Sequence, residues 1–497
     1  MVWSRLIARS LYPSISFLKH QKRQCSGLWS SSGEAGCGQH RARPPTCEPE
    51  LTIKRARLGT EITLDVAGVS VTYSKNHRGI DHGPLFQERD RIALKSEQLN
   101  YDWYEEQGED PTPSEMAFTR QLKHLVPRLE LLGFNLGRVR GEYDALAQGC
   151  LEYRQSAQDD SDKGAPEFMV FDEFRAFVSA HPLVILDDTF ISGSDKASEV
   201  KIRGRFDAMQ LDRIPCYRAY DTQAYSERGF FVGLIEFLHP YSVLRLLAEG
   251  EANADLPVVW QYGPLVQAGW AAEKEFMPHA RRIETFLIAT EGSSDVYILK
   301  HALALLRPGI VDFFRFIDVS ESHPFSGTGN LVKFAEGLAK IDVQNQIVFV
   351  FDNDAEGLDA HQRLSSLSLP TNMRGMMLPE LDDFRAFPAQ GPEGIHNSDI
   401  NRRAAAIECY LDLDAGGHAP ARILWTTYKK NLGIYQGALE NKESYGKEFL
   451  RLTGETLAAG KYDIRKIESV LDSLITECTA IAAGRWDPSE VEMRDVY

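Results

Sequence analysis

The pattern of hydrophobic and polar positions changes near residue 283. Before it, residues 60–75 alternate in polarity around a central turn, as two strands of a β-hairpin do. Apolar residues at helical spacing predict helix within residues 115–150, where Pro127 should kink or break it. This mixture predicts an α+β accessory domain over residues 58–275.

Beyond residue 283, short apolar runs alternate with helical patterns. The runs at residues 285–290, 311–319 and 346–351 predict strands, and a helical pattern follows each of them. A β-α-β-α-β-α order predicts an α/β domain, with a parallel sheet covered by helices on both faces. We place this domain at residues 282–395 and predict a helical extension over residues 396–497.

The first 57 residues differ in composition from the rest of the chain. They hold ten Lys or Arg and three Asp or Glu, a net charge of +7, which leaves −23 for the remainder of a chain whose total is −16. They are rich in Ser and Arg and show no periodicity. Three interpretations stay open: an organellar transit peptide, a disordered basic arm, or translation that begins downstream, near Leu58.

Charge and cysteine usage limit the function classes. The acidic total does not exclude a nucleic-acid partner, because a basic patch need not alter the total and metal-binding carboxylates add negative charge. The seven cysteines form no Cys-x-x-Cys pair, which argues against a zinc or redox site, and their odd number and wide spacing favour a reducing cytoplasm. No apolar stretch approaches the about 18–20 residues of a membrane span, so we expect no membrane partner. A homo-oligomer is left open.

Acidic residues follow two of the predicted strands. Glu291 comes after the first strand, and Asp352 and Asp354 come after the third. If these strands are neighbours, the three side chains converge at the carboxyl edge of the sheet, where open parallel sheets bind ligands. Converging carboxylates repel one another unless a cation lies among them, and oxygen ligands suit Mg²⁺ or Mn²⁺. The alternative is that these acids are ordinary loop or helix-capping residues with no function in catalysis or metal binding.

Two segments carry a resemblance to a known fold. Residues 291–295 (Glu-Gly-Ser-Ser-Asp) and 352–357 (Asp-Asn-Asp-Ala-Glu-Gly) resemble, in order and separation, the acidic motifs of the Toprim fold of topoisomerases, primases and OLD-family nucleases. The resemblance covers roughly residues 282–375. It implies catalytic roles for Glu291, Asp352 and Asp354, and it adds Asp295 and Glu356 as candidate metal ligands.

Further residues are carried over from the OLD-type nucleases. Residues 407–411 (Ile-Glu-Cys-Tyr-Leu) are similar to a Glu-Asn-Tyr segment of that family, which makes Glu408 a candidate extra ligand, although a Cys stands in place of the Asn. OLD-type sites also use a basic residue to stabilise transition-state charge. Lys442 is our candidate for that role, and Lys429 and Lys430 compete with it.

The N-terminal region carries its own resemblance. Residues 71–76 (Val-Thr-Tyr-Ser-Lys-Asn), 128–134 (Arg-Leu-Glu-Leu-Leu-Gly-Phe) and 240–245 (Pro-Tyr-Ser-Val-Leu-Arg) resemble the HEPN/Toprim N-terminal domain of bacterial proteins, which precedes a HEPN ribonuclease or a Toprim domain. Arg175 and His181 have the Arg-x₅-His spacing of a HEPN nuclease, but such spacing often arises by chance.

We therefore expect a nuclease that uses Mg²⁺ or Mn²⁺ to cleave phosphodiester bonds in DNA or RNA. By family analogy, it would serve bacterial defence against phage or a toxin-like system. A non-catalytic Toprim module that only binds nucleic acid is the main alternative. A primase lacks support because no Cys/His cluster exists, a topoisomerase would need a further tyrosine domain, and a sugar-nucleotide transferase would leave Glu291 unexplained.

Overall fold

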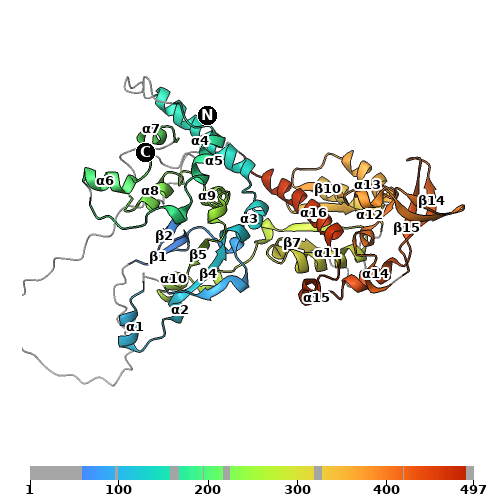
Figure 1. The fold of residues 1–497 in the computed structure, drawn as a ribbon, viewed down its shortest axis with the longest axis horizontal. Coiled ribbons are helices and arrows are strands. Elements are labelled where there is room, and N and C mark those ends of the chain that lie inside the picture. The colour runs from blue at the N-terminus through green and yellow to red at the C-terminus, as the bar shows by residue number, and fades with distance from the viewer. Residues whose placement is uncertain are drawn as a thin grey trace, which may run out of the picture.

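A computed structural model of the protein describes residues 59–95, 99–156, 167–193, 195–215, 224–317, 327–417 and 419–487. The basic leader of residues 1–57 lies outside these ranges, so its three interpretations stay open. The described residues form two lobes, with the N-terminal domain at one end and the predicted Toprim-like domain at the other (Figure 1).

The N-terminal domain is built on a five-stranded antiparallel sheet in the order β2-β1-β5-β4-β3. The predicted hairpin is confirmed, and its turn residues Ala67 and Gly68 have φ angles of 50° and 80°. Positive φ at both central positions is typical of the type I′ turn, whose twist matches that of paired strands. The strands are β1 (Glu61–Val66), β2 (Val69–Lys75), β3 (Arg91–Ala93), β4 (Met116–Gln121) and β5 (Pro257–Gln261).

Ten helices accompany this sheet in the described part of the domain. The helical prediction for residues 115–150 needs correction where the segment opens with strand β4, and Pro127 does not break the helix, because it lies inside one. The break falls instead near Gly133, which has a φ of 89° and is closely approached by the backbone of Ala482. The helices are α1 (Tyr101–Gln107), α2 (Thr112–Glu115), α3 (Leu122–Leu131), α4 (Leu136–Ser156), α5 (Phe171–Ser179), α6 (Lys196–Arg203), α7 (Ala208–Leu211), α8 (Glu227–Gly233), α9 (Pro240–Leu247) and α10 (Gly263–Gln267).

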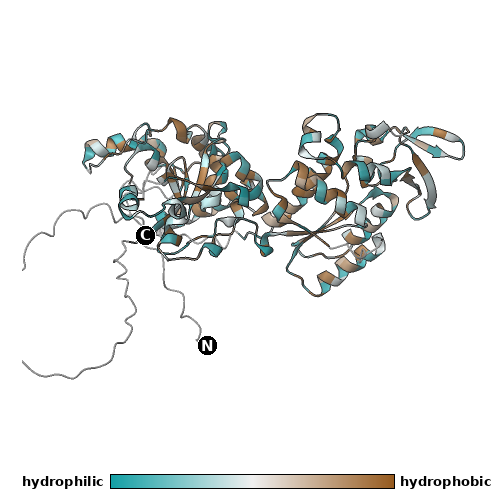
Figure 2. Ribbon diagram, turned by 90° about the horizontal axis from the view of Figure 1, so that it is seen from below, coloured by the Kyte–Doolittle hydropathy of each residue, from teal (hydrophilic) through white to brown (hydrophobic). Residues whose placement is uncertain are grey.

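The second domain contains the predicted parallel sheet, in the order β10-β8-β6-β7. The α/β fold class is therefore confirmed, and β6 and β8 are neighbours, as the convergence of the acids requires. The strands of this sheet are coloured mainly as hydrophobic residues, whereas the helices around them mix hydrophobic and hydrophilic residues (Figure 2). The strands are β6 (Phe286–Ala289), β7 (Phe314–Phe316), β8 (Gln346–Phe351) and β10 (Met373–Met377).

Alternate residues of β8 enter two separate cores. Val348 and Val350 pack with apolar residues of α11 (Ser293–Leu306) and α16 (Arg465–Ala483). Ile347, Phe349 and Phe351 belong to the opposite core, with apolar residues of α12 (Thr328–Lys340) and α13 (Ala355–Ser365). A strand buried on both faces needs a continuous apolar run, which explains why residues 346–351 gave the clearest strand pattern.

The prediction for the second strand of this domain needs correction. The strand predicted at residues 311–319 is shorter, because Val311–Phe313 form a 3-10 turn and only Phe314–Phe316 pair with β6; residues 318–326 lie outside the described ranges.

The extension predicted as helical over residues 396–497 also contains strands. They complete a second sheet in the order β12-β11-β14-β15 and a short ladder of β9 with β13. Isolated β-branched and aromatic runs gain their strand conformation here from pairing, which local propensity does not reveal. These elements are β9 (Asn353–Asp354), β11 (Phe387–Gly391), β12 (Gly394–Ser398), β13 (Ala404–Ala405), β14 (Ile423–Lys429), β15 (Ile434–Leu439), α14 (Lys442–Phe449) and α15 (Gly454–Ala458).

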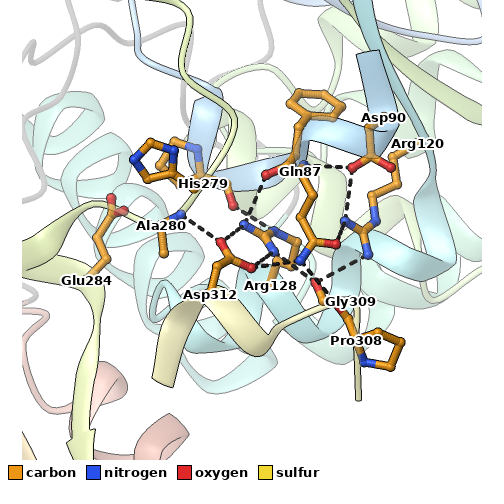
Figure 3. A network of polar contacts seen from close by, with 12 residues as sticks. Gln87, Asp90, Arg120, Arg128, His279, Ala280, Glu284, Pro308, Gly309 and Asp312 are labelled. Atoms are coloured by element: carbon orange, nitrogen blue, oxygen red, sulfur yellow. Dashed lines mark hydrogen bonds and ion pairs between the residues drawn. The ribbon is translucent and has the colours of Figure 1, made fainter. Parts of the chain in front are cut away.

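A buried ion pair joins the two domains (Figure 3). The guanidinium of Arg128, on α3, is fully buried and donates to both carboxylate oxygens of Asp312 at 2.7 and 2.8 Å. Asp312 also accepts from the backbone N–H of Ala280 at 2.8 Å and from the Gln87 amide at 2.9 Å. Burial by itself would raise the pKa of Asp312, but these donors hold that pKa below its ordinary value. The negative charge of Asp312 at the junction of the two domains is therefore balanced by Arg128 and by two further hydrogen-bond donors.

Candidate active site

Strand β6 and helix α11 position the first pair of acids. After the strand, the hydroxyl of Thr290 donates to the carbonyl of Gly292 at 2.9 Å, which closes a tight turn. The backbone N–H of Gly292 donates to the Asp295 carboxylate at 3.0 Å, at the first turn of α11. Glu291 therefore lies at the carboxyl edge of the sheet, with the buried Asp295 one helical turn away.

The second pair of acids flanks the end of strand β8. Asp352 accepts the backbone N–H of Ile407 at 3.1 Å. Asp354 caps α13, because its carboxylate accepts the backbone N–H groups of Glu356 at 3.0 Å and Gly357 at 2.7 Å. A Cβ on Gly357 would lie 2.1 Å from the carbonyl oxygen of Asp352, so only glycine fits at that position.

Asn353 fixes the orientation of the two acids beside it. Its side chain is fully buried; the amide nitrogen donates to Asn401 and Tyr410, each at 3.2 Å, and its oxygen accepts the backbone N–H of Arg402 at 2.7 Å. Successive side chains of an extended segment point in opposite directions, so Asp352 and Asp354 both point away from the side on which Asn353 is held.

Gln436 is a site residue that the sequence analysis missed. It reaches from β15, donating to the Asp354 carboxylate at 2.6 Å and accepting the backbone N–H of Ala355 at 2.8 Å. It therefore supports both the acid and the start of α13. No signal in the sequence marks it, because a single glutamine in a strand far along the chain matches no motif.

The carboxylates lie close enough to perturb one another strongly. Burial, followed by the charges of Asp354 and Asp295, raises the pKa of Glu291 to about 9. Burial, followed by the charge of Glu408, raises the pKa of Asp295 to about 7. Burial and the charges of Asp295 and Glu291 raise the pKa of Asp352 well above its ordinary value. Five predicted site acids therefore share one region, in which full ionisation is costly.

Glu408 comes from a separate segment. It lies in the 3-10 turn Ile407–Tyr410, is only 3% exposed, and its charge raises the pKa of Asp295 and Asp352. The structure therefore brings it to the same region as the acids of the two strands. Cys409, where OLD-like proteins carry Asn, is fully buried and its thiol donates to the carbonyl of Ala404 at 3.7 Å.

The remaining predicted residues lie at the rim. Glu356 is exposed and pairs with the Lys429 ammonium at 2.7 Å. Lys442, the exposed first residue of α14, lies near enough to Asp295 for its charge to lower the pKa of that acid. Lys442 and Lys429 thus approach the acids from different elements, whereas Lys430 is exposed at the end of the β14–β15 hairpin. We call the acids together the acid cluster (Glu291, Asp295, Asp352, Asp354 and Glu408, with Glu356 at its rim).

The spacing of the side chains differs from that of a formed metal centre. Among the described residues, no three His, Cys, Asp or Glu side chains are arranged closely enough to enclose an ion.

The HEPN-like pair has structural partners. Arg175 forms an ion pair with Glu249 at 3.6 Å. His181 lies just beyond the end of α5, donates a hydrogen bond from its ring Nδ1 to the carbonyl of Phe177 at 2.7 Å, and packs against the ring of Phe206. These contacts account for both residues without a catalytic role.

One comparison with known proteins gave a match. Residues 58–284 match the family model described as HEPN/Toprim N-terminal domain 1, which confirms the resemblance of the N-terminal region. Neither the curated proteins nor the solved structures gave a match to the chain. The family match indicates a nucleic-acid-related, nuclease-like function. It ends before strand β6, so the likeness of the second domain to OLD-type Toprim nucleases stays a prediction. Across the described residues, every helix is too short or too polar to cross a membrane.

Proposed function

We propose that the protein is a metal-dependent nuclease that hydrolyses phosphodiester bonds in DNA or RNA. One observation carries the proposal: Glu291 and Asp352 end adjacent parallel strands, and the pKa values of both are raised by burial and by neighbouring acids. Such an arrangement lowers the stability of the fold, and a functional role explains why it is kept. Strongly perturbed acids at the carboxyl edge of an open sheet are typical of active sites.

The chemistry of the side chains fits Mg²⁺ or Mn²⁺. The candidate ligands are Glu291, Asp295, Asp352, Asp354 and Glu408, and all offer carboxylate oxygens, which hard divalent cations prefer. The exposed Glu356 would join them only by leaving Lys429. Because the side chains stand apart among the described residues, binding would draw them inward by side-chain rotation.

Each residue has a distinct role under this proposal. A bound cation would supply an activated water molecule and stabilise charge on the phosphate oxygens. Glu291, Asp352 and Asp354 would hold it, while Gln436 keeps the Asp354 carboxylate oriented. Lys442 would offset negative charge that develops on the phosphate, in the manner of electrostatic stabilisation. By analogy with the resembled families, such a nuclease would act in bacterial phage defence or in a toxin-like system.

A cleavage assay tests the proposal. The purified protein is incubated with supercoiled plasmid and with total tRNA, each in Mg²⁺, Mn²⁺ or EDTA. We expect cleavage of one substrate in metal, and its loss in Glu291→Gln and Asp352→Asn. Glu199→Gln is the matched control, because Glu199 is an exposed acid of α6 in the other domain. Cleavage that persists in both site variants, or in EDTA, would overturn the proposal.

The open spacing of the acids favours one alternative, a Toprim-like module that binds nucleic acid without cutting it. Under this alternative, the wild-type protein would shift the mobility of plasmid or tRNA in a gel, yet leave both intact in every metal tested.

A further inference from the structure

The β14–β15 hairpin differs in composition from the rest of the chain. Residues 423–439 contain two lysines, three aromatic residues and no Asp or Glu, within a chain of net charge −16. The hairpin projects from the end of the molecule farthest from the N-terminal domain (Figure 1). It is therefore a basic, aromatic arm on an acidic protein.

Two exposed tyrosines lie side by side on one face of this hairpin. Tyr428 and Tyr435 are direct cross-strand partners, and their ring centroids are 5.0 Å apart. They are 51% and 56% exposed, and the ring of Trp425 lies 6.4 Å from that of Tyr435. Neighbouring exposed aromatic rings leave apolar area in water at a cost, so such a patch commonly marks a binding surface.

The other face of the same hairpin is attached to the acid cluster. Gln436, next to Tyr435, bonds the Asp354 carboxylate at 2.6 Å, and Lys429, next to Tyr428, pairs with Glu356 at 2.7 Å. Adjacent residues of a strand point to opposite faces. The hairpin therefore carries the tyrosine pair on one face and the residues that support the candidate active site on the other.

We infer that this tyrosine pair is a stacking platform for the unpaired bases of single-stranded nucleic acid, an inference that rests on the proposed nuclease function and specifies its substrate. Aromatic rings stack on any base, whereas bases inside a duplex already stack on one another. Lys430, exposed beside the pair, supplies a positive charge for the phosphate backbone.

A binding assay in EDTA separates this inference from the nuclease proposal, because no cleavage is needed. Fluorescence anisotropy is measured with labelled oligothymidylate and oligouridylate of about 20 nucleotides and with a duplex of equal length, a size chosen to exceed common single-strand site sizes. We expect the single strands to bind more tightly than the duplex. Replacing both Tyr428 and Tyr435 by Ala should weaken single-strand binding by about tenfold or more, given the usual effect of losing one stacked base.

Three further variants sharpen the outcome. Replacing both tyrosines by Phe keeps the rings and should keep the affinity. Tyr225→Ala removes a 51% exposed tyrosine of the N-terminal domain and should leave binding unchanged. Equal binding by wild type and the double Ala variant, with both folded by circular dichroism, would overturn the inference, as would a preference for duplex. Neither result bears on metal-dependent cleavage, which Glu291→Gln tests separately.

Discussion

Two groups of partly buried acids lie at opposite edges of the same parallel sheet and differ in the charge of their neighbours. At the amino edge, Asp312 is surrounded by donors and its pKa is lowered, chiefly by Arg128 against the opposing effect of burial. At the carboxyl edge, Glu291 and Asp352 have mainly other acids as neighbours, and their pKa values are raised, first by burial and then by the charges of those acids.

The difference indicates what each group does. A buried carboxylate with a complete set of partners contributes to a specific geometry, here the junction of two domains. Partly buried carboxylates without a counter-charge destabilise the fold, which is the basis of the proposed cation site. Four predictions test this contrast, in order of decreasing effect.

Removing the cation of the junction should have the largest effect. Arg128→Met leaves Asp312 buried without its main partner, so we expect the free energy of unfolding to fall by about 3–5 kcal/mol in urea titrations. Lys123→Ala is the control, because it removes a lysine of the same helix whose ion pair with Asp255 is exposed, and it should cost below about 1 kcal/mol. Similar losses in both variants would show that the junction is no more important than a surface pair.

Supplying a cation to the acid cluster should have the next largest effect. At a metal concentration about 100 times its dissociation constant, Mg²⁺ or Mn²⁺ should stabilise the wild-type protein by about 2.7 kcal/mol, because only the folded state holds the acids together. Asp352→Asn should abolish the shift in thermal melts, and Glu199→Gln should keep it. A wild-type melting temperature that does not respond to either metal would contradict the proposed cation site.

Removing one acid should stabilise the metal-free protein. A carboxyl whose folded pKa is raised contributes most to stability below its unfolded pKa, and that contribution is lost as pH rises towards the folded value. For Glu291 this window runs from 4.5 to about 9. In EDTA, Glu291→Gln should therefore be more stable than wild type by on the order of 1 kcal/mol at neutral pH. The difference in stability between Glu291→Gln and wild type should shrink as pH falls towards 4.5.

Asp312→Asn gives the opposite sign and serves as the control for this measurement. The lowered pKa of Asp312 means that its ionised form stabilises the fold above the ordinary aspartate pKa and ceases to do so in acid. The variant should be less stable than wild type at neutral pH, and the deficit should narrow as pH falls below the ordinary value. If the stability of Glu291→Gln and of Asp312→Asn, each relative to wild type, changed with pH in the same way, the contrast between the two edges would be wrong.

The smallest effect should come from the rim. Lys429 and Glu356 form an ion pair in which both side chains are substantially exposed, at 31% and 48%. Lys429→Ala should therefore change the free energy of unfolding by below about 1 kcal/mol in urea. A loss comparable to that of Arg128→Met would mean that the rim pair is part of the buried network.

The sequence allowed the strands and acids of the second domain to be predicted because each signal is local. The apolar run of β8 needs burial on both faces, and the acids that follow β6 and β8 lie at one edge once the strands are parallel neighbours. The N-terminal hairpin was predictable for the same reason, since alternation and a two-residue turn define it locally.

Residues whose roles depend on distant partners could not be predicted. Arg128 is one of several arginines until Asp312, 184 positions away, is placed against it. Gln436 becomes a site residue only because strand β15 lies next to the start of α13, where Asp354 is. Strands β14 and β15 were predicted as part of a helical extension. Pairing between segments far apart supplies the stability of such strands, and local propensity does not contain it.

The position of helix α16 has a consequence for synthesis on the ribosome. The parallel sheet is complete once Met377 has been made, yet Val348 and Val350 pack against a helix that begins only at Arg465. The same helix contacts α3 of the N-terminal domain, so one late segment covers surfaces of both domains. The part of this apolar face that α11 leaves uncovered therefore stays exposed until α16 leaves the exit tunnel. A chain stopped before α16 would expose that part of the face to chaperones and proteases.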